Sequence, residues 1–321
     1  MPHRLRIVYM GTPDFAVYPL QRLLEEGHHV VGVVTNPDKP AGRGQKLQES
    51  AVKRFVQARG LTLLQPERFR DDAFLAQLEA LRADIQLVVA FKMLPEVVWN
   101  MPPLGTVNLH ASLLPDYRGA APINRAIMNG ETFSGVTTFL LKQEMDTGNI
   151  IFQQRVEVDE KMTAGELHDR LMEVGAELLL RTVNAMASGD YSLQEQRTLL
   201  KGREAKMAPK IFKEEMKIDW GREGVDIYNH IRGLSPFPTA WMELENRETK
   251  EVVSLKIFRA TYERVEHQHP LALEADGGER FSIYIKGGIL HLEEIQLSGK
   301  RRMDTTEFTR GFRLQEWSVR P

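Results

Sequence analysis

The stretch LRIVYMGTPDFAVYPLQRLLEE, residues 5–26, decides the fold, because it predicts a buried strand followed by an amphipathic helix. The strand, residues 5–10, is almost entirely apolar and ends at Gly11-Thr12-Pro13. Short continuous apolar runs are typical of strands in a parallel sheet that is covered on both faces. The apolar residues that follow have the spacing of one helix face: Phe15, Val17, Leu20, Leu23 and Leu24.

Three further apolar runs continue this alternation of strands and helices. They are residues 30–35, 85–90 and 106–109. Strands that alternate with helices indicate a doubly wound α/β domain, so we expect a Rossmann-like, mostly parallel sheet. The first turn reads Gly-Thr-Pro-Asp and lacks the Gly-x-Gly-x-x-Gly phosphate cradle, which argues against a nicotinamide-dependent oxidoreductase.

The second half of the chain has a different texture, which predicts a second domain. At 321 residues the chain exceeds the roughly 100–200 residues of most single domains. Residues 197–217 carry seven Lys or Arg against three Glu, which favours a basic linker. Short alternating segments then follow a helical stretch at 224–232, and they predict a small β-barrel or sandwich. These segments are residues 241–244, 252–258, 281–285 and 289–295.

Composition limits the classes of function. The content of 42% hydrophobic and 27% charged residues is that of an ordinary soluble protein. The formal net charge of −2 means that binding of nucleic acid has to come from local basic patches. The absence of cysteine excludes disulfides, thiolate metal sites and a cysteine nucleophile. Because no apolar run approaches about 18 residues, we predict a cytoplasmic protein without a membrane segment.

A polar segment, NPDKPAGRGQKLQES, occupies residues 36–50 directly after the second predicted strand. Its prolines, its glycines and its few apolar residues predict a long exposed loop. Loops of this length are uncommon unless they are functional or disordered, so this one is a candidate functional segment.

The densest group of reactive side chains is NLHASLLPDYRGAAP, residues 108–122, which follows a predicted strand. Open α/β sheets bind ligands beyond the carboxyl ends of their strands, so this run is expected at a ligand site. Asn108 and His110 are two residues apart and point to the same side in an extended segment. The cluster EMDTG, residues 144–148, follows the strand-like run 136–141 and is expected to bring Asp146 to the same edge of the sheet.

An amide, an imidazole and a carboxylate suit acyl transfer to an amine. Asn108 and a protonated His110 can donate hydrogen bonds to the oxygen on which negative charge develops. Asp146 can accept the proton of the amine, directly or through water, and can keep His110 charged. The pattern alone leaves ordinary turn or capping roles open for each residue. It also leaves open a metal site at His110 and Asp146, but no second well-spaced His or Glu accompanies them, and we predict no metal.

The ordered run NLHASLLPDYRGAAPI, followed by MDTGNII, resembles the folate-dependent formyltransferases. The motif of that family is Asn-x-His, then Ser-Leu-Leu-Pro-x-x-Arg-Gly, with a later Asp-x-Gly. The resemblance implies that Asn108, His110 and Asp146 are catalytic and that 10-formyltetrahydrofolate is the formyl donor. The folate-binding segment of the family falls on Ser112, Leu113, Leu114 and Pro115.

Three features resemble the branch of this family that acts on aminoacylated transfer RNA. Two are the opening RIVYMGTPDFA, residues 6–16, and the loop PDKPAGRGQKL, residues 37–47. The third is KIDW, residues 217–220, with IRGLSPFPTAW, residues 231–241, which is similar to the start of an OB-like second domain. The resemblance therefore implies the initiator Met-tRNA as the partner that accepts the formyl group.

These observations together predict the domain organisation of a monomer. A catalytic domain is expected at residues 1–190, a basic linker at 191–208, and an OB-like β-barrel domain that binds tRNA at 209–321. The resemblance implies that the loop at 36–50 enters the acceptor stem, with Arg43 as its leading contact. Phosphates attract lysine and arginine even on a near-neutral protein. The predicted tRNA contacts are Arg43, Lys39, Lys46, Lys206 and Lys210.

One departure from the family pattern follows the apolar run 85–90. Relatives commonly have Ala-Tyr-Gly in a loop that lines the pterin pocket, whereas this chain has Ala90-Phe91-Lys92. Two other functions stay open. An amino-sugar formyltransferase would use the same chemistry, but the basic loop and linker argue against it. A non-catalytic RNA-binding protein would not depend on the three predicted catalytic residues.

Overall fold

The computed structural model describes residues 4–41, 46–276 and 280–321. The chain forms two compact units, and each unit combines separate stretches of sequence. Unit 1 consists of Met1–Gly119, Ser134–Val156 and His168–Ala208. Unit 2 consists of Ala120–Phe133, Glu157–Leu167 and Pro209–Pro321.

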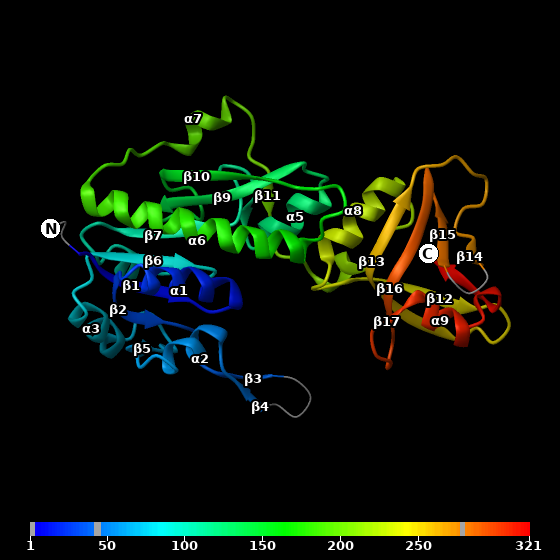
Figure 1. The fold of residues 1–321 in the computed structure, drawn as a ribbon, viewed down its shortest axis with the longest axis horizontal. Coiled ribbons are helices and arrows are strands. Elements are labelled where there is room, and N and C mark those ends of the chain that lie inside the picture. The colour runs from blue at the N-terminus through cyan, green and yellow to red at the C-terminus, as the bar shows by residue number, and fades with distance from the viewer. Residues whose placement is uncertain (1–3, 42–45, 277–279) are drawn as a thin grey trace. The chain divides into compact units, whose positions relative to one another are not determined.

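Unit 1 is built on a seven-stranded sheet (Figure 1). Its strands are β1 (Arg6–Gly11), β2 (His29–Val34), β5 (Leu63–Leu64), β6 (Ile85–Val89), β7 (Thr106–His110), β9 (Phe133–Leu140) and β10 (Ile150–Glu157). Their order across the sheet is β10-β9-β7-β6-β1-β2-β5. The pairs from β7 through β6, β1 and β2 to β5 are all parallel, whereas β7 and β9 are antiparallel.

Helices connect and cover these strands. They are α1 (Val17–Glu25), α2 (Ala51–Gln57), α3 (Asp72–Ala80), α4 (Glu96–Trp99) and α6 (Ala164–Ser188), with a 3-10 turn η1 (Asp14–Ala16) before α1. One core of unit 1 combines strand and helix residues: Val8, Met10, Val34, Phe74, Leu78, Val88, Leu94 and Val98. Strand residues buried from both sides explain the continuous apolar runs of the sequence.

Helix α6 lies along β7 and β9 (Figure 1). A Cβ atom on Gly175 would lie 3.0 Å from Leu109 Cδ2, so glycine at this position allows the helix to approach the sheet closely. The hydroxyls of Thr138 on β9 and Thr182 on α6 form a buried hydrogen bond of 2.9 Å. This packing holds the strand that carries Asn108 and His110 against a long helix.

The predicted Rossmann-like, mostly parallel sheet is confirmed. β1 is central, and the winding reverses between β1 and β6, which is where α/β sheets open a crevice at the carboxyl ends of the strands. One local expectation needs correction. Residues 36–50 are not one long loop, because β3 (Lys39–Ala41) and β4 (Lys46–Gln48) pair as an antiparallel ribbon. Lys39, Pro40, Leu47 and Gln48 of this ribbon are exposed, and exposed strands need no alternation of apolar residues, so the sequence pattern does not reveal them.

The segment expected as a basic linker also contains regular structure. It holds α7 (Gln196–Leu200) and β11 (Met207–Ala208), and β11 pairs in parallel with β8 (Arg118–Gly119). The guanidinium of Arg203 donates to both carboxylate oxygens of Asp116 at 2.7 and 2.6 Å. Burial alone would raise the pKa of Asp116, but the hydrogen bonds from Arg203 and Lys206 lower it overall. Residues up to Ala208 therefore pack as part of unit 1.

Unit 2 is a small antiparallel barrel with helices, as predicted from the short alternating segments. Its strands are β12 (Ala240–Asn246), β13 (Val252–Glu263), β14 (Leu273–Asp276), β15 (Arg280–Ile285), β16 (Gly288–Leu297), β17 (Met303–Asp304) and β18 (Trp317–Arg320). The sheet order is β14-β15-β16-β13-β12-β18, with β17 beside β16. Because β14 also approaches β18, the sheet is nearly closed. The helices are α5 (Pro122–Met128), α8 (Gly224–Leu234) and α9 (Thr305–Gly311), with the 3-10 turns η2 (Lys213–Met216) and η3 (Leu314–Glu316).

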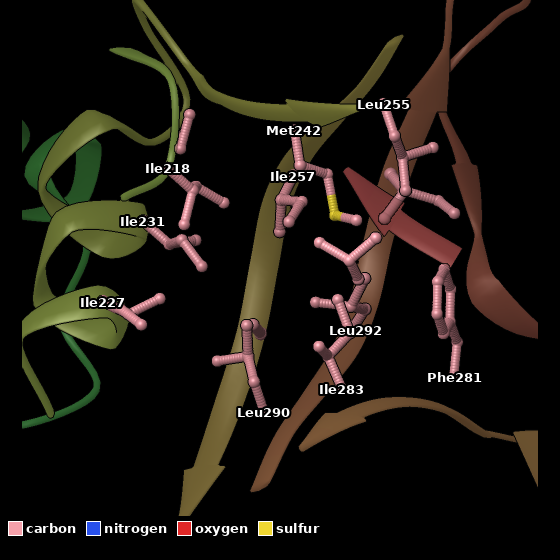
Figure 2. Packing of buried hydrophobic residues seen from close by; sticks show 14 of the residues in the cluster. Ile218, Ile227, Ile231, Met242, Leu255, Ile257, Phe281, Ile283, Leu290 and Leu292 are labelled. Atoms are coloured by element: carbon pink, nitrogen blue, oxygen red, sulfur yellow. The ribbon is translucent and has the colours of Figure 1, made fainter. Parts of the chain in front are cut away.

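Helix α8 packs against the strands of the barrel and against helix α5 in unit 2. Ile227 and Ile231 on α8 pack toward the strand residues of the barrel, such as Ile257 and Leu290 (Figure 2). α5 lies close to the end of α8, where a Cβ on Gly233 would meet Met128 Cγ at 2.5 Å. The amide of Asn124 donates to the Gly233 carbonyl at 2.8 Å and fixes this contact.

Candidate active site

Strand β7 carries Asn108 and His110, two residues apart. His110 is 8% exposed, and its Nε2 lies 2.8 Å from the carbonyl oxygen of Tyr117. A carbonyl oxygen can only accept a hydrogen bond, so Nε2 carries the hydrogen and donates it. Nδ1 is then the ring nitrogen that is left for a substrate or water.

Asn108 is half-buried, and its side-chain amide makes no hydrogen bond within the part of the chain that the structure describes. A side-chain amide offers two donor hydrogens and one acceptor oxygen. Buried polar groups normally have partners, so this amide is available to a ligand.

Asp146 reaches the same neighbourhood through the backbone that follows Tyr117. Its Oδ2 accepts a hydrogen bond of 2.9 Å from the N–H of Gly119, two residues after the carbonyl that binds His110. Between the described residues, no salt bridge joins Asp146 to His110. The segment 117–119 therefore holds both side chains by separate hydrogen bonds, and the expected direct support of His110 by the carboxylate is not seen.

The route by which Asp146 arrives differs from the one expected. Leu140 at the end of β9 pairs with Val107 near the start of β7, because the two strands are antiparallel. The carboxyl end of β9 thus lies at the opposite edge from His110, and the loop 141–149 carries Asp146 to Gly119. Asp146 itself adopts a left-handed backbone with φ of 55°. Gly148 packs against the Leu140 carbonyl so closely that any Cβ would overlap it.

Gln196 anchors this loop and was not identified from the sequence. Its Nε2 donates to the carbonyls of Asp146 and Gly148, both at 2.8 Å, and its Oε1 accepts from Arg118 Nη2 at 2.7 Å. Only 2% of Gln196 is exposed, so all of these groups depend on one another for hydrogen bonds. No sequence signal marks it, because a single glutamine in a basic stretch is usually a solvated residue.

The predicted folate-binding segment is largely internal. Ser112 is fully buried and its hydroxyl donates to the Asp116 carbonyl at 2.6 Å. Leu114 is 1% exposed and packs with Phe139 and Ile150. Pro115 is buried, so Leu113 is the one member of the four that is half-exposed. A ligand at this segment would meet Leu113 and the backbone, while the other side chains shape the segment from within.

The predicted tRNA contacts lie in three places. Lys39 is exposed at the start of the β3–β4 ribbon, and Lys46 begins β4. Arg43 lies outside the described residues. Lys206 is exposed in unit 1, where its Nζ lies 5.9 Å from the ring centroid of Tyr117. Lys210 is exposed in unit 2, with its Nζ 5.6 Å from the ring centroid of Phe212.

Lys92, the residue that departs from the family pattern, lies over an aromatic cluster. Its Nζ is 4.5 Å from the ring centroid of Phe69, whose ring lies 5.7 Å from that of Phe91. Partial burial and the nearby charge of Lys39 lower the pKa of Lys92. Two mutually repelling cations at this place favour the approach of an anionic group.

Two searches for other features bear on the predictions. Across the described ranges, no group of three or more His, Asp or Glu side chains is arranged to hold a metal ion. Nor does any helix there have the length and apolar character needed to cross a membrane.

Comparison with known families gives a direct match to both halves of the chain. A sequence model described as "Formyl transferase" matches residues 4–183. A second, described as "Formyl transferase, C-terminal domain", matches residues 210–313. The chain belongs to the formyl transferase family.

Curated members of the formyl transferase family are similar over nearly their full length. A methionyl-tRNA formyltransferase of Parabacteroides distasonis is 50% identical over 319 residues, which cover 98% of this chain and 98% of that protein. The methionyl-tRNA formyltransferase of Flavobacterium johnsoniae is 46% identical over 315 residues, with 98% of each chain covered.

Solved structures of more distant proteins share the fold at much lower identity. The sugar 3N-formyl transferase WlaRD, solved in the presence of dTDP and 5-N-formyl-THF, has a TM-score of 0.64 and 20% identity, and the match covers 93% of this chain and 100% of that one. HypX of Aquifex aeolicus, solved with tetrahydrofolic acid, has a TM-score of 0.64 and 17% identity, over 95% of this chain and 47% of that one. These likenesses concern the fold of the formyl transferase family alone.

Proposed function

We propose that this protein transfers a formyl group from 10-formyltetrahydrofolate to the free amino group of initiator Met-tRNA. The formylated tRNA is then used in translation initiation. The observation that carries this function is the 50% identity with a curated methionyl-tRNA formyltransferase over 98% of both chains. The geometry around β7 supports it, because the imidazole of His110 and the carboxylate of Asp146 both bind one short backbone segment, and the amide of Asn108, which makes no hydrogen bond within the described residues, lies two positions before His110 on the same strand.

The three side chains have complementary tasks in this reaction. The amine nitrogen attacks the formyl carbon, a tetrahedral intermediate forms, and the bond from that carbon to the folate nitrogen then breaks. The Asn108 amide and a protonated Nδ1 of His110 donate to the oxygen that becomes negative. Asp146 accepts the proton that the amine loses, directly or through water, and this proton is passed to the leaving folate nitrogen. Formylated Met-tRNA and tetrahydrofolate are the products.

The folate is proposed to lie against Ser112, Leu113, Leu114 and Pro115. The N–H of Leu114 donates to Oγ1 of Thr137 at 3.1 Å, and its carbonyl oxygen accepts from Nε2 of Gln153 at 2.8 Å, which keeps the segment in one conformation for a ligand. Of two solved structures with the same fold, one was obtained in the presence of 5-N-formyl-THF and the other in complex with tetrahydrofolic acid. No metal is part of this proposal, since the chemistry needs only hydrogen-bond donors and a base.

The tRNA is proposed to contact the β3–β4 ribbon and the stretch that joins the two units. The contacts are Arg43, Lys39, Lys46, Lys206 and Lys210, among which the exposed lysines offer charges to phosphates. We assign catalysis to residues 1–190, a basic linker to 191–208 and tRNA binding to the barrel at 209–321. A monomer and a cytoplasmic location stay predictions.

A formylation assay tests the proposed function. The purified protein is incubated with 10-formyltetrahydrofolate and initiator tRNA charged with methionine, and formyl-methionine is measured after the ester is hydrolysed. Parallel reactions contain uncharged tRNA or a dTDP-linked amino sugar as the acceptor. Formylation of Met-tRNA alone is expected. Turnover of the amino sugar without turnover of Met-tRNA would establish the alternative acceptor instead.

A further inference from the structure

Unit 2 contains a pocket, with a volume of about 230 Å³, that no part of the proposed mechanism uses. The segment 157–167, helix α8 and strands β13 and β16 contribute to its lining. The charged and aromatic residues that line it are Lys161, Tyr228, Arg232, Phe258, Arg259 and Glu293.

Arg232 is the unusual member of this group, because it is a buried cation that forms no salt bridge within the described residues, although the charges of Asp159 and Glu160 lie near enough to act on it. Only 6% of it is exposed. Nε donates to the Asn229 amide oxygen at 2.8 Å, and Nη1 donates to the carbonyls of Met162 at 2.9 Å and Asp159 at 3.4 Å. These partners are all neutral, and within the described residues no carboxylate forms a salt bridge with Arg232. A buried charge normally has a paired charge or a ligand, because its desolvation is costly.

Further hydrogen-bond donors line the same pocket without partners of their own. Nη2 of Arg232, the ammonium of Lys161 and the hydroxyl of Tyr228 make no hydrogen bond within the described residues. The ring of Tyr228 is held by stacking on Tyr262 at 6.1 Å between centroids. Donors that converge without an acceptor call for a ligand rich in acceptor oxygens.

Two carboxylates moderate the positive charge. Arg259 is paired with Glu166 at 3.2 Å, so this arginine adds little net charge. Glu293 is exposed and lines the pocket as its one acidic side chain among the described residues. The cations Lys161 and Arg232 remain against Glu293, which leaves the pocket suited to a single compact anion.

We propose that this pocket binds one phosphate group of the tRNA backbone, with Arg232 and Lys161 as its charged contacts and Tyr228 as a neutral donor. The volume is smaller than the roughly 300–1,000 Å³ of pockets that enclose a whole small ligand, which favours one group of a larger partner. Phosphate oxygens match several converging donors, and arginine is well suited to bind them. This inference rests on the proposed function, because that function supplies the polyanionic partner.

Binding of Met-tRNA to full-length variants tests the pocket. Lys161→Glu reverses the charge at the pocket, Arg232→Lys keeps the charge but removes Nη2, and Tyr228→Phe removes the hydroxyl. Lys256→Glu is the matched control, because Lys256 is an exposed lysine of β13 that does not line the pocket. Dissociation constants are measured over a range of KCl concentrations, together with the melting temperature, kcat and KM for Met-tRNA.

The Lys161→Glu and Arg232→Lys variants are each expected to weaken tRNA binding about tenfold or more, as for loss of a charged hydrogen bond. For Lys161→Glu, the slope of the logarithm of affinity against the logarithm of salt concentration should fall by about one, whereas Arg232→Lys keeps the charge and should leave this slope nearly unchanged. KM for Met-tRNA should rise while kcat at saturating tRNA stays near that of the wild type. Tyr228→Phe should have a smaller effect in the same direction, and Lys256→Glu should change the dissociation constant less than twofold.

Other outcomes overturn the inference in distinguishable ways. Equal effects of Lys161→Glu and Lys256→Glu would indicate a general electrostatic field instead of a site. A lower melting temperature of Arg232→Lys with unchanged tRNA binding in all pocket variants would assign Arg232 to folding alone. Stabilisation of the wild type by inorganic phosphate at constant ionic strength, again with unchanged tRNA binding, would assign the pocket to a free anion. Failure of the wild type to bind or formylate Met-tRNA would instead refute the proposed function, and this inference with it.

Discussion

Nε2 of His110 donates to the carbonyl oxygen of Tyr117 at 2.8 Å, and this contact fixes which ring nitrogen faces chemistry. Because Nε2 holds its hydrogen for the backbone, His110 can act on a substrate only through Nδ1. The imidazole supports a developing oxyanion when Nδ1 is protonated and can accept a proton when it is not. The same backbone segment binds Asp146 through Gly119, so the two side chains are positioned by one short piece of chain.

Replacement of His110 tests its catalytic role. His110→Asn should lower kcat by about 10²–10⁴-fold, the usual loss when a general acid–base or oxyanion contact is removed. The dissociation constant of Met-tRNA should stay near the wild-type value, because the His110 ring is buried and its Nε2 is bound to the Tyr117 carbonyl oxygen. Single-turnover formylation and tRNA binding are the two measurements. His168→Asn is the matched control, since His168 packs its ring against Phe15 and pairs with Asp169; similar turnover of the two variants would refute the role of His110.

Asp146→Asn separates the charge of the carboxylate from its structural contact. The asparagine oxygen can still accept from Gly119 N–H, and asparagine tolerates the left-handed backbone with φ of 55°. We therefore expect an unchanged melting temperature but a kcat lower by about 10²-fold or more, because the base is lost. Asp146→Ala should in addition lose stability, since alanine lacks the acceptor and disfavours that backbone. Full activity of Asp146→Asn would show that the carboxylate takes no proton.

Gln196→Leu should affect both stability and turnover. It would leave the carbonyls of Asp146 and Gly148 and the guanidinium of Arg118 without their buried partner, so unfolding free energy should fall by roughly 2–4 kcal/mol. Loss of the anchor should also lower kcat, because Asp146 is no longer held beside Gly119, while KM for Met-tRNA should not change. Urea denaturation and steady-state kinetics measure the two effects. Gln194→Leu serves as the control, since the side chain of Gln194 is exposed; a destabilised Gln196→Leu with normal kcat would limit Gln196 to a role in folding.

Arg43→Ala should impair the use of tRNA and spare the folate. Arg43 lies outside the described residues and follows the last residue of β3, Ala41, by two positions in the sequence. Removal of one phosphate contact should raise KM for Met-tRNA. It should also lower, by about one, the slope of the logarithm of tRNA affinity against the logarithm of salt concentration. Folate binding, followed by fluorescence quenching, should be the same as in the wild type. Arg59→Ala is the comparison, since Arg59 is an exposed arginine in the turn after α2 that packs on Phe55; equal tRNA kinetics in the two variants would remove Arg43 from the binding site.

His230 should make stability depend on acidity. Burial lowers the pKa of His230 to about 4, although a backbone hydrogen bond with Met216 acts in the opposite direction. Between about pH 6.5 and pH 4 the unfolded chain binds a proton that the folded chain does not. The free energy of unfolding therefore decreases as the pH is lowered through this range. The full effect of this shift is roughly 3 kcal/mol. His230→Leu should remove this part of the pH dependence without loss of stability at pH 7, as denaturation at a series of pH values would show; an unaltered pH profile would contradict the assignment.

The sequence predicts the periodic parts of this protein well, and it predicts the connections poorly. The strands β1, β2, β6 and β7 and the helix α1 follow from apolar periodicity, because burial on one or both faces imposes a regular pattern. The strands β3, β4 and β11 are only two or three residues long, so no periodic pattern marks them. Asn108, His110 and Asp146 were found by motif. Gln196 was not, because its importance comes from contacts across 50 residues of sequence that no local pattern records.

The units of this protein interleave along the chain, and this limits how it can be divided. α5 and the segment 157–167 belong to unit 2, although both lie within the first 190 residues, and unit 1 continues to Ala208. A fragment that starts at Pro209 would lack the helix that meets Gly233 and the carbonyls that bind Arg232. A fragment that ends at Ser188 would lack Gln196. Gene fusions that exchange the barrel between relatives therefore have to transfer three separate stretches together, or match them by compensating substitutions.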